Sequence, residues 1–295
     1  AFAQRVDEAV QRILQIKLRL YNDNFSSEEV KPDDSGISEV GQGEEVTFQV
    51  AREAASLISP SQEEIEERLG GPPQLNERIV FFTDVRMWEQ CSTCSPQPGI
   101  DTNALMDTVL SLYGQSAAGQ VRSWYLSSFT MADLAHFLGK QPPAVPIVPL
   151  TLADQLVDPL QHADWLVFCI LDSTDQAYGA DALKLLLDQR MDLARNKRVV
   201  VFAFDVPYGL DATDISKVDV YYTLYSQGHA FIDVAAHLLF NELSASGAPP
   251  VSVPGIGYDL IEATSPDPDQ IISLAAYVDD EEITSEDYPP ELMVG

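Results

Sequence analysis

The sequence has few cysteines and no long apolar run. It contains three cysteines, too few for the multi-disulfide framework of a small secreted domain. No apolar stretch approaches the roughly 20 residues of a membrane-spanning helix, so we expect no membrane insertion. The N-terminus begins with a charged, amphipathic pattern and not with the apolar core of a signal peptide. The compartment, cytoplasmic or extracytoplasmic, stays open.

Basic residues are also scarce. The chain carries 17 Lys and Arg against 46 Asp and Glu, a net charge of -29 at pH 7. Such a surface repels phosphate backbones, which disfavours nucleic-acid binding, and it repels anionic membranes for the same reason. Much of the excess lies in residues 28–45 and 279–291, so solubility explains it better than a dedicated cation-binding role.

Several catalytic signatures are missing. The four histidines have no histidine partner four residues away, so a two-histidine metal face is absent and we expect no bound metal. No G-x-S-x-G nucleophile elbow is present. The stretch D-A-T-D-I-S-K, residues 211–217, lacks the glycine-rich loop that would hold a phosphate, and a capped helical turn explains it better. We expect no cofactor.

The chain divides into four segments. Residues 1–21 form an amphipathic helix with nothing beside it in sequence to pack against. Residues 22–43 are polar and resemble a linker, residues 44–260 carry the core, and residues 261–295 form an acidic tail with one possible strand at 270–277. Within the core, a helix is predicted from residue 44 to just before Pro60, followed by a short acidic helix at 63–69.

From residue 79 onward, strand and helix patterns alternate. The expected strands are residues 79–83, 121–126, 165–171, 199–204 and 218–224, and some of them, such as V-V-V-F-A-F at 199–204, are apolar at every position. The expected helices lie between and after them: residues 103–112, 131–138, 152–162, 180–193 and 230–243. Strands that are apolar at every position are covered on both faces. The sequence therefore predicts an α/β domain, a mostly parallel sheet sandwiched between helices.

Three of the expected strands end in aspartate: Asp84, Asp172 and Asp205. The carboxyl ends of parallel strands form the ligand crevice of such a sheet. Three carboxylates there could bind a hydroxylated ligand or a hard cation, or one could act as an acid or base with a raised pKa. The alternative is structural, since Asp at a strand end often caps the next helix or is simply solvated.

The motif W-E-Q-C-S-T-C-S-P-Q-P follows the first long strand, and its Cys91 and Cys94 are spaced as in thioredoxin-type sites. A reactive thiolate would need a helix that starts at the motif, but two prolines and a glycine follow. A local disulfide, or two free thiols in a loop, is the better interpretation. Cys169 lies in an apolar run and is expected in the core.

Three further segments carry a resemblance to a known family. A-A-H-L-L-F-N-E-L-S-A-S-G-A-P-P-V-S-V-P-G, residues 235–255, resembles the close of the C-terminal domain of family 3 glycoside hydrolases, where a helix ending in Leu-Phe-Gly precedes P-x-G-x-L-P-V-S-F-P. Asn241 stands where that Gly is usual, Ser244 or Ala245 where Pro is usual, and Pro249 in place of Leu. V-A-R-E-A-A-S at 50–56 is similar to the helix that opens that domain. Residues 7–21 resemble the last helix of the family's barrel.

The resemblance implies a domain that lacks the catalytic barrel. In this family the nucleophile is an Asp on an N-terminal (β/α)8 barrel, and the hexosaminidase branch also keeps its Lys-His-Phe-Pro-Gly-His-Gly loop there. Neither lies in this chain, and no motif matches the acid/base Glu that β-glucosidase members take from the C-terminal domain. The resemblance thus implies a β-N-acetylhexosaminidase-like parent, a barrel and a carbohydrate as partners, and no catalytic residue in this chain. The chain alone is expected to be inactive.

Two other functions stay open. The chain could be a stand-alone carbohydrate-binding or protein-interaction module of the same fold. It could also be a thiol oxidoreductase at Cys91 and Cys94, which the prolines after the motif disfavour.

Overall fold

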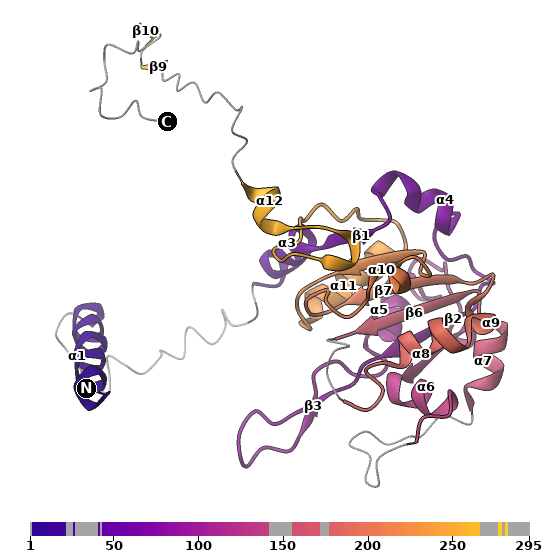
Figure 1. The fold of residues 1–295 in the computed structure, drawn as a ribbon, viewed down its shortest axis with the longest axis horizontal. Helices are drawn as coiled ribbons and strands as arrows, with labels where there is room; N and C mark the ends of the chain where they lie inside the picture. Colours follow the sequence, from indigo (N-terminus) through magenta and orange to yellow (C-terminus); the bar gives the residue numbers. More distant parts are fainter. Residues whose placement is uncertain are drawn as a thin grey trace.

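The structure, a computed structural model, describes residues 2–21, 26, 41, 43–141, 155–171, 177–265, 277–278 and 281–282. Its centre is a six-stranded sheet with the strand order β1-β8-β7-β6-β2-β5 (Figure 1). The strands are β1 (Ser56–Ser59), β2 (Ile79–Thr83), β5 (Leu126–Thr130), β6 (Trp165–Ile170), β7 (Arg198–Ala203) and β8 (Val220–Thr223). All neighbours pair in parallel except β1, which is antiparallel to β8. The predicted mostly parallel α/β fold is confirmed.

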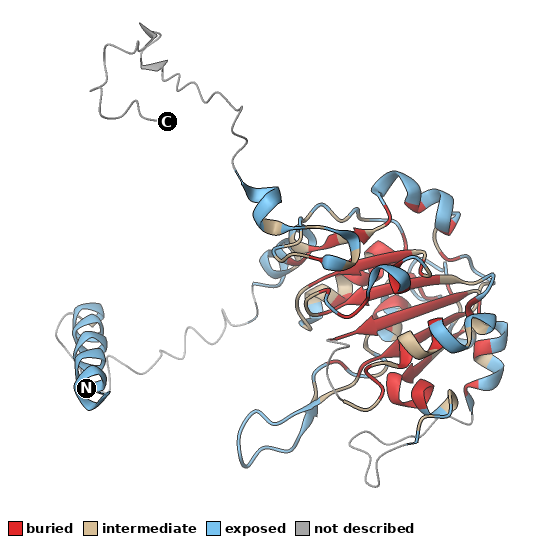
Figure 2. Cartoon of the chain, viewed as in Figure 1, coloured by how far each residue is buried: buried red, intermediate tan, exposed pale blue. Residues whose placement is uncertain are grey.

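Helices cover both faces of the sheet. One face packs against α3 (Glu44–Ala54), α5 (Ala104–Tyr113) and α11 (His229–Leu239). The other packs against α6 (Met131–Phe137), α7 (Val157–His162), α8 (Ala182–Gln189), α9 (Met191–Ala194) and α10 (Ala212–Ile215). Strands β2, β6 and β8 are therefore buried at every position, as Figure 2 shows for the sheet as a whole. On the second face Phe82 stacks on Phe168, with 5.1 Å between ring centroids.

The predicted helix from residue 44 to just before Pro60 is wrong in its second half. Helix α3 ends at Ala54, and the next residues form β1, in which Ser56 pairs with Thr223 of β8. Without β1, strand β8 would expose a row of unpaired backbone groups at the edge of the sheet. The pairing partner lies far away in sequence, so local periodicity alone favours a longer helix.

The predicted strand at 121–126 is displaced. Ser123–Tyr125 form a 3-10 helix, and strand β5 begins only at Leu126, which pairs with Ile79 of β2. The strand ends at Thr130 because this residue caps α6: its side chain accepts a hydrogen bond from the Asp133 backbone N–H, and the Asp133 carboxylate accepts one from the Thr130 N–H. A local capping signal thus sets the end of the strand.

Three predicted helices are shorter than expected, and the one at 152–162 is, within the described residues, only α7, Val157–His162. The helix at 180–193 is divided into α8 and α9 at Arg190. Helix α11 ends at Leu239 and not at residue 243, and Asn241 adopts a left-handed backbone with φ of 55°. Glycine and asparagine are the residues that tolerate this conformation after a helix. The acidic helix at 63–69 is a 3-10 turn, Gln62–Glu64, continued by α4 (Ile65–Leu69).

Helix α1 (Phe2–Leu20) has no buried residue, and Figure 1 shows it apart from the sheet. Its apolar side chains, among them Val6, Val10 and Ile13, are about half exposed. After α12 (Leu260–Thr264), the described residues resume only with β9 (Tyr277–Val278) and β10 (Glu281–Glu282). Of the strand expected at 270–277, only Tyr277 is described, as the first residue of β9, and most of the linker at 22–43 lies outside the described residues. Within the part described, no helix is both long and apolar enough to cross a membrane.

Candidate functional site

Asp84 lies directly after β2 at the carboxyl edge of the sheet. Its backbone N–H donates to the Cys169 carbonyl at 2.9 Å, which continues the pairing of β2 with β6, and only 5% of the residue is exposed. Its carboxylate receives two hydrogen bonds from the Arg86 guanidinium, from Nη2 at 2.7 Å and Nε at 3.2 Å. A buried carboxylate needs such a partner. Asp84 therefore orients Arg86 and the loop that follows β2.

Asp205 lies after β7 and organises its own loop. Its Oδ1 accepts a hydrogen bond from the Val206 N–H at 2.8 Å, and its backbone carbonyl accepts one from Thr223 Oγ1 at 3.0 Å. Strand β6 separates β7 from β2, which places the two strand ends about 10 Å apart. Asp172, the third residue of this expected group, lies outside the described residues. The role of the three as ligand residues stays a prediction.

Strands β3 (Met87–Trp88) and β4 (Gln97–Pro98) form a hairpin that projects from the same edge of the sheet (Figure 1). We call residues 87–98 the arm. A disulfide joins Cys91 to Cys94 at its tip, with 5.1 Å between the Cα atoms. The residues after the motif enter β4 and not a helix, so the helix start that a thioredoxin-type thiolate needs does not follow these cysteines.

Asp133 is a buried carboxylate at this edge that the sequence interpretation did not single out. It is 1% exposed, and its Oδ2 accepts hydrogen bonds from the Thr130 backbone N–H and Oγ1. Its Oδ1 has no hydrogen-bond partner among the residues that the structure describes. The local pattern T-M-A-D, a capping-box spacing, could have identified it.

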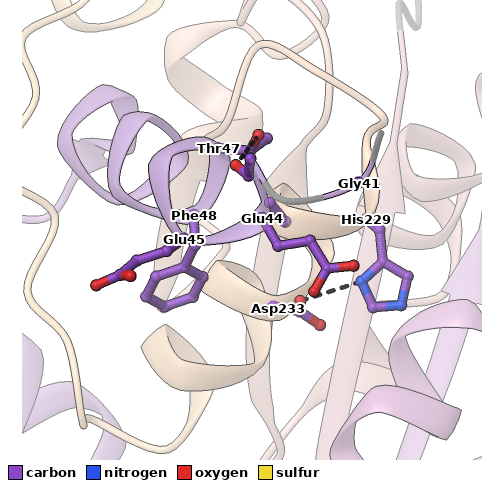
Figure 3. A pocket seen from close by; sticks show the side chains of 9 residues that line it. Gly41, Glu44, Glu45, Thr47, Phe48, His229 and Asp233 are labelled. Carbon is purple, nitrogen blue, oxygen red and sulfur yellow. Dashed lines mark hydrogen bonds and ion pairs between the residues drawn. The ribbon is translucent and has the colours of Figure 1, made fainter. Parts of the chain in front are cut away.

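A pocket of about 770 Å³ opens where the N-terminal turns of α3 and α11 meet (Figure 3). Glu44, Glu45 and Phe48 line it from α3, and His229 and Asp233 from α11. His229 Nδ1 lies 3.0 Å from Asp233 Oδ2, and Figure 3 shows the Glu44 side chain turned toward this pair. The described residues of the lining include no Lys or Arg and several carboxylates, which disfavours anions.

A second pocket of about 530 Å³ shares Phe48, His229 and Asp233 with the first and continues between α5 and α11 as far as His237. His237 Nδ1 lies 2.7 Å from Glu242 Oε2, and the Tyr113 hydroxyl donates to the same oxygen at 2.7 Å. One carboxylate oxygen of Glu242 thus lies against both the end of α5 and the last turn of α11. His229, Asp233 and His237 form a row on one face of α11, because residues four and eight positions apart lie on the same side of a helix. The sequence interpretation did not single out this row.

Burial and hydrogen bonding shift several pKa values. Burial, and then the hydrogen bond to Glu242, raise the pKa of Tyr113 well above its ordinary value. The Tyr113 hydrogen bond, helped by His237, lowers the pKa of Glu242. Burial raises the pKa of the Cys169 thiol to about 12, so this core cysteine is unreactive. No group of three or more His, Cys, Asp or Glu in the described ranges could hold a metal ion.

Comparison with known proteins gives matches only among solved structures. No family model matches the sequence, and no curated protein does. A fungal multi-domain family 3 β-N-acetylglucosaminidase matches 93% of this chain at 15% identity, with a TM-score of 0.51. A family 3 β-N-acetylglucosaminidase from Paenibacillus sp. str. FPU-7 matches 85% at 13% identity, again with a TM-score of 0.51. The chain has the fold of a family 3 glycoside hydrolase domain.

A β-glucosidase involved in saponin metabolism, from intestinal bacteria, shows the same likeness, with 84% of this chain covered, 16% identity and a TM-score of 0.50. This chain spans 25%, 40% and 38% of the lengths of these three proteins, respectively. The family 3 domain fold thus extends over most of this chain, which corresponds to a minority of each matched protein.

Two of the three segments that resemble the family meet in this fold. Helix α3 packs on α11 through the fully buried Ala51. Beyond α11, the Gly247 N–H donates to the Ala55 carbonyl at 2.9 Å, and Val253 is fully buried. A Cβ at Gly247 would lie 2.5 Å from the Ala54 carbonyl oxygen, so this glycine permits the close approach of the two segments.

Proposed function

We propose that the chain is the C-terminal α/β domain of a family 3 glycoside hydrolase of the β-N-acetylhexosaminidase type. In this proposal it packs against an N-terminal (β/α)8 barrel, and its carboxyl edge at Asp84, Asp172 and Asp205 forms one wall of the carbohydrate site. The observation that carries the proposal is the likeness of nearly the whole chain to a minor part of two β-N-acetylglucosaminidases and a β-glucosidase.

The segment lengths agree with this proposal. Helix α1 exposes its apolar row, as a helix taken from a neighbouring domain would, and about 20 residues separate it from α3. Residues 7–21 resemble the last helix of the barrel, so in this proposal the rest of the barrel covers the apolar side of α1. We infer the segments accordingly: 1–21 from the barrel, 22–43 the linker, 44–260 the domain and 261–295 the tail.

The carboxylates support a structural role for this edge. A retaining glycosidase needs two carboxyl groups about 5 Å apart, and an inverting one needs them about 6.5–9.5 Å apart around a water. Asp84 is held by Arg86, and Asp205 holds the turn after β7 about two strand spacings away. Both carboxylates are thus engaged within this chain, Asp84 by Arg86 and Asp205 by the turn after β7, and the proposal places the reacting groups on the barrel.

The proposal predicts that the purified chain does not hydrolyse 4-nitrophenyl N-acetyl-β-glucosaminide or 4-nitrophenyl β-glucoside faster than buffer, measured by nitrophenolate release. The protein expressed from the complete reading frame that encodes the chain should hydrolyse the first substrate faster than the second. Activity of the isolated chain would contradict the assignment of the reacting groups. A complete reading frame without a barrel would favour the binding-module alternative.

A further inference from the structure

The arm stands clear of the hydrophobic core. Residues 87–97 are all exposed, and the two strands share only two pairs, Met87 with Pro98 and Trp88 with Gln97. A two-stranded hairpin without a buried face is marginally stable in water. The shape of the arm therefore depends on local links more than on packing.

The Cys91–Cys94 disulfide is the covalent link in this arm. One backbone hydrogen bond supports it, from the Cys94 N–H to the Cys91 carbonyl at 3.0 Å. Both cysteines and all their neighbours in sequence are exposed, so a dithiol can approach the sulfurs. Cys169, the third cysteine, is 1% exposed and its raised pKa keeps it a thiol, so it is not available to exchange with them.

The arm is connected to the carboxyl edge through Trp88. A Cβ at Gly99 would lie 2.7 Å from Trp88 Nε1, so the indole rests directly on Gly99, beside the Gln227 side chain. The Gly99 N–H donates to the Arg86 carbonyl at 2.9 Å, and the Arg86 guanidinium holds Asp84. A change at the tip can therefore reach Asp84 through a short series of contacts.

We propose that Cys91 and Cys94 form a thiol–disulfide exchange site for dithiols, and that their reduction releases Trp88 from Gly99. A dithiol attacks one sulfur through its thiolate, and the mixed disulfide is then resolved by the second thiol of the same reagent. The S–S bond of the protein breaks, the reagent becomes a disulfide, and the protein gains two protons and two electrons as two thiols. The redox state of the tip then sets the shape of the edge beside Asp84.

Alkylation under native conditions tests the first half of the proposal. Mass spectrometry should find no iodoacetamide label on the untreated chain and two labels, on Cys91 and Cys94, after treatment with dithiothreitol. Cys169 should be labelled only after denaturation, which makes it the internal control. Free Cys91 and Cys94 in the untreated chain, or a pair that resists dithiothreitol in the folded protein, would overturn the proposal.

The indole N–H signals of the three tryptophans test the second half by NMR. On reduction the Trp88 signal should move by more than its line width, toward its position in a Cys91→Ser/Cys94→Ser variant. The Trp124 signal should stay, because this tryptophan, 60% exposed against 54% for Trp88, precedes β5 at the amino-terminal end of the parallel strands, away from the arm. Cleavage by a glutamate-specific protease after Glu89 should become at least fivefold faster. A reduced arm with an unchanged Trp88 signal and an unchanged cleavage rate would contradict release of the indole.

Discussion

At the scale of single residues, the Glu242 carboxylate is stabilised by hydrogen bonds from two side chains. Glu242 Oε2 accepts from both the Tyr113 hydroxyl and His237 Nδ1, each at 2.7 Å. Tyr113 also stacks on Phe240, with 3.8 Å between ring centroids. This one contact set joins the end of α5 to the end of α11, so its protonation bears on how the two helices stay together.

Removing the Tyr113 hydroxyl should raise the pKa of Glu242 toward its ordinary value. The hydrogen bond from Tyr113 is the largest cause of the lowered pKa, so Tyr113→Phe leaves only His237 to stabilise the charge. A carboxyl whose pKa is lowered by folding contributes stability above its unfolded pKa, and this contribution is lost as the pH falls through the folded pKa. The variant should therefore lose less stability between pH 5 and pH 3 than the parent chain.

The measurement is a carbon-13 NMR titration of the Glu242 carboxyl, together with urea unfolding across the same pH range. Tyr208→Phe is the matched control, because Tyr208 is an exposed tyrosine in the loop after β7. An unchanged Glu242 midpoint in Tyr113→Phe would assign the lowered pKa to His237 alone.

At the scale of elements, the strands with helices on both faces are the ones the sequence predicts well. Strand β2 begins and ends at the predicted residues, because an apolar run between Arg78 and Asp84 has one simple interpretation. Strand β1 and the late start of β5 were not predicted, because pairing with distant strands decides them: Ser56 pairs with Thr223, and Leu126 pairs with Ile79.

The candidate site was less predictable than the fold. The positions of Asp84 and Asp205 after β2 and β7 follow from the strand pattern alone. That Asp84 is held by Arg86 and that Asp205 caps its own loop depends on side-chain directions, which spacing does not fix. The pockets at α3, α5 and α11 join three segments that are distant in sequence, so they could not be seen before the helices were packed.

Adding one methyl group at Gly247, where the segment after α11 meets the end of α3, should lower the stability of the domain. Gly247→Ala would place a Cβ 2.5 Å from the Ala54 carbonyl oxygen, so backbone has to move. We expect a loss of about 2 kcal/mol in the free energy of unfolding. Gly43→Ala is the control, because a Cβ there meets nothing within 4 Å, and its stability should change by less than about 0.5 kcal/mol. Chemical denaturation monitored by circular dichroism compares the two. Equal losses would show that the close approach at Gly247 carries no special cost.

At the scale of the whole molecule, the α/β domain buries its apolar side chains and helix α1 leaves its own exposed. The sheet and its helices bury two continuous cores, whereas α1 buries nothing among the described residues. An amphipathic helix without a partner gains little from its apolar side, because helix stability in proteins comes mostly from packing that side. In the proposed function, that side belongs against the barrel.

A charged substitution should therefore affect the stability of the α/β domain much less in α1 than in the sheet. Ile13→Asp changes a side chain in a residue that is 53% exposed, and we expect no change in the melting temperature of the α/β domain beyond about 1 °C. Ile79→Asp places an unpaired carboxylate in fully buried β2, and this variant should fail to fold. Calorimetry and the yield of soluble protein measure both. A melting temperature that falls clearly in Ile13→Asp would indicate that α1 packs on the domain in solution.

The antiparallel pairing of β1 with β8 also has a consequence for synthesis. Strand β1 ends at Ser59, and its partner begins at Val220, so at 5–20 residues per second the ribosome needs roughly 10–30 s to deliver it. During this interval the nascent chain carries β1 and the buried face of α3 without the surface that covers them. We expect a ribosome-associated chaperone to bind these segments during this interval and to be released when β8 and α11 emerge.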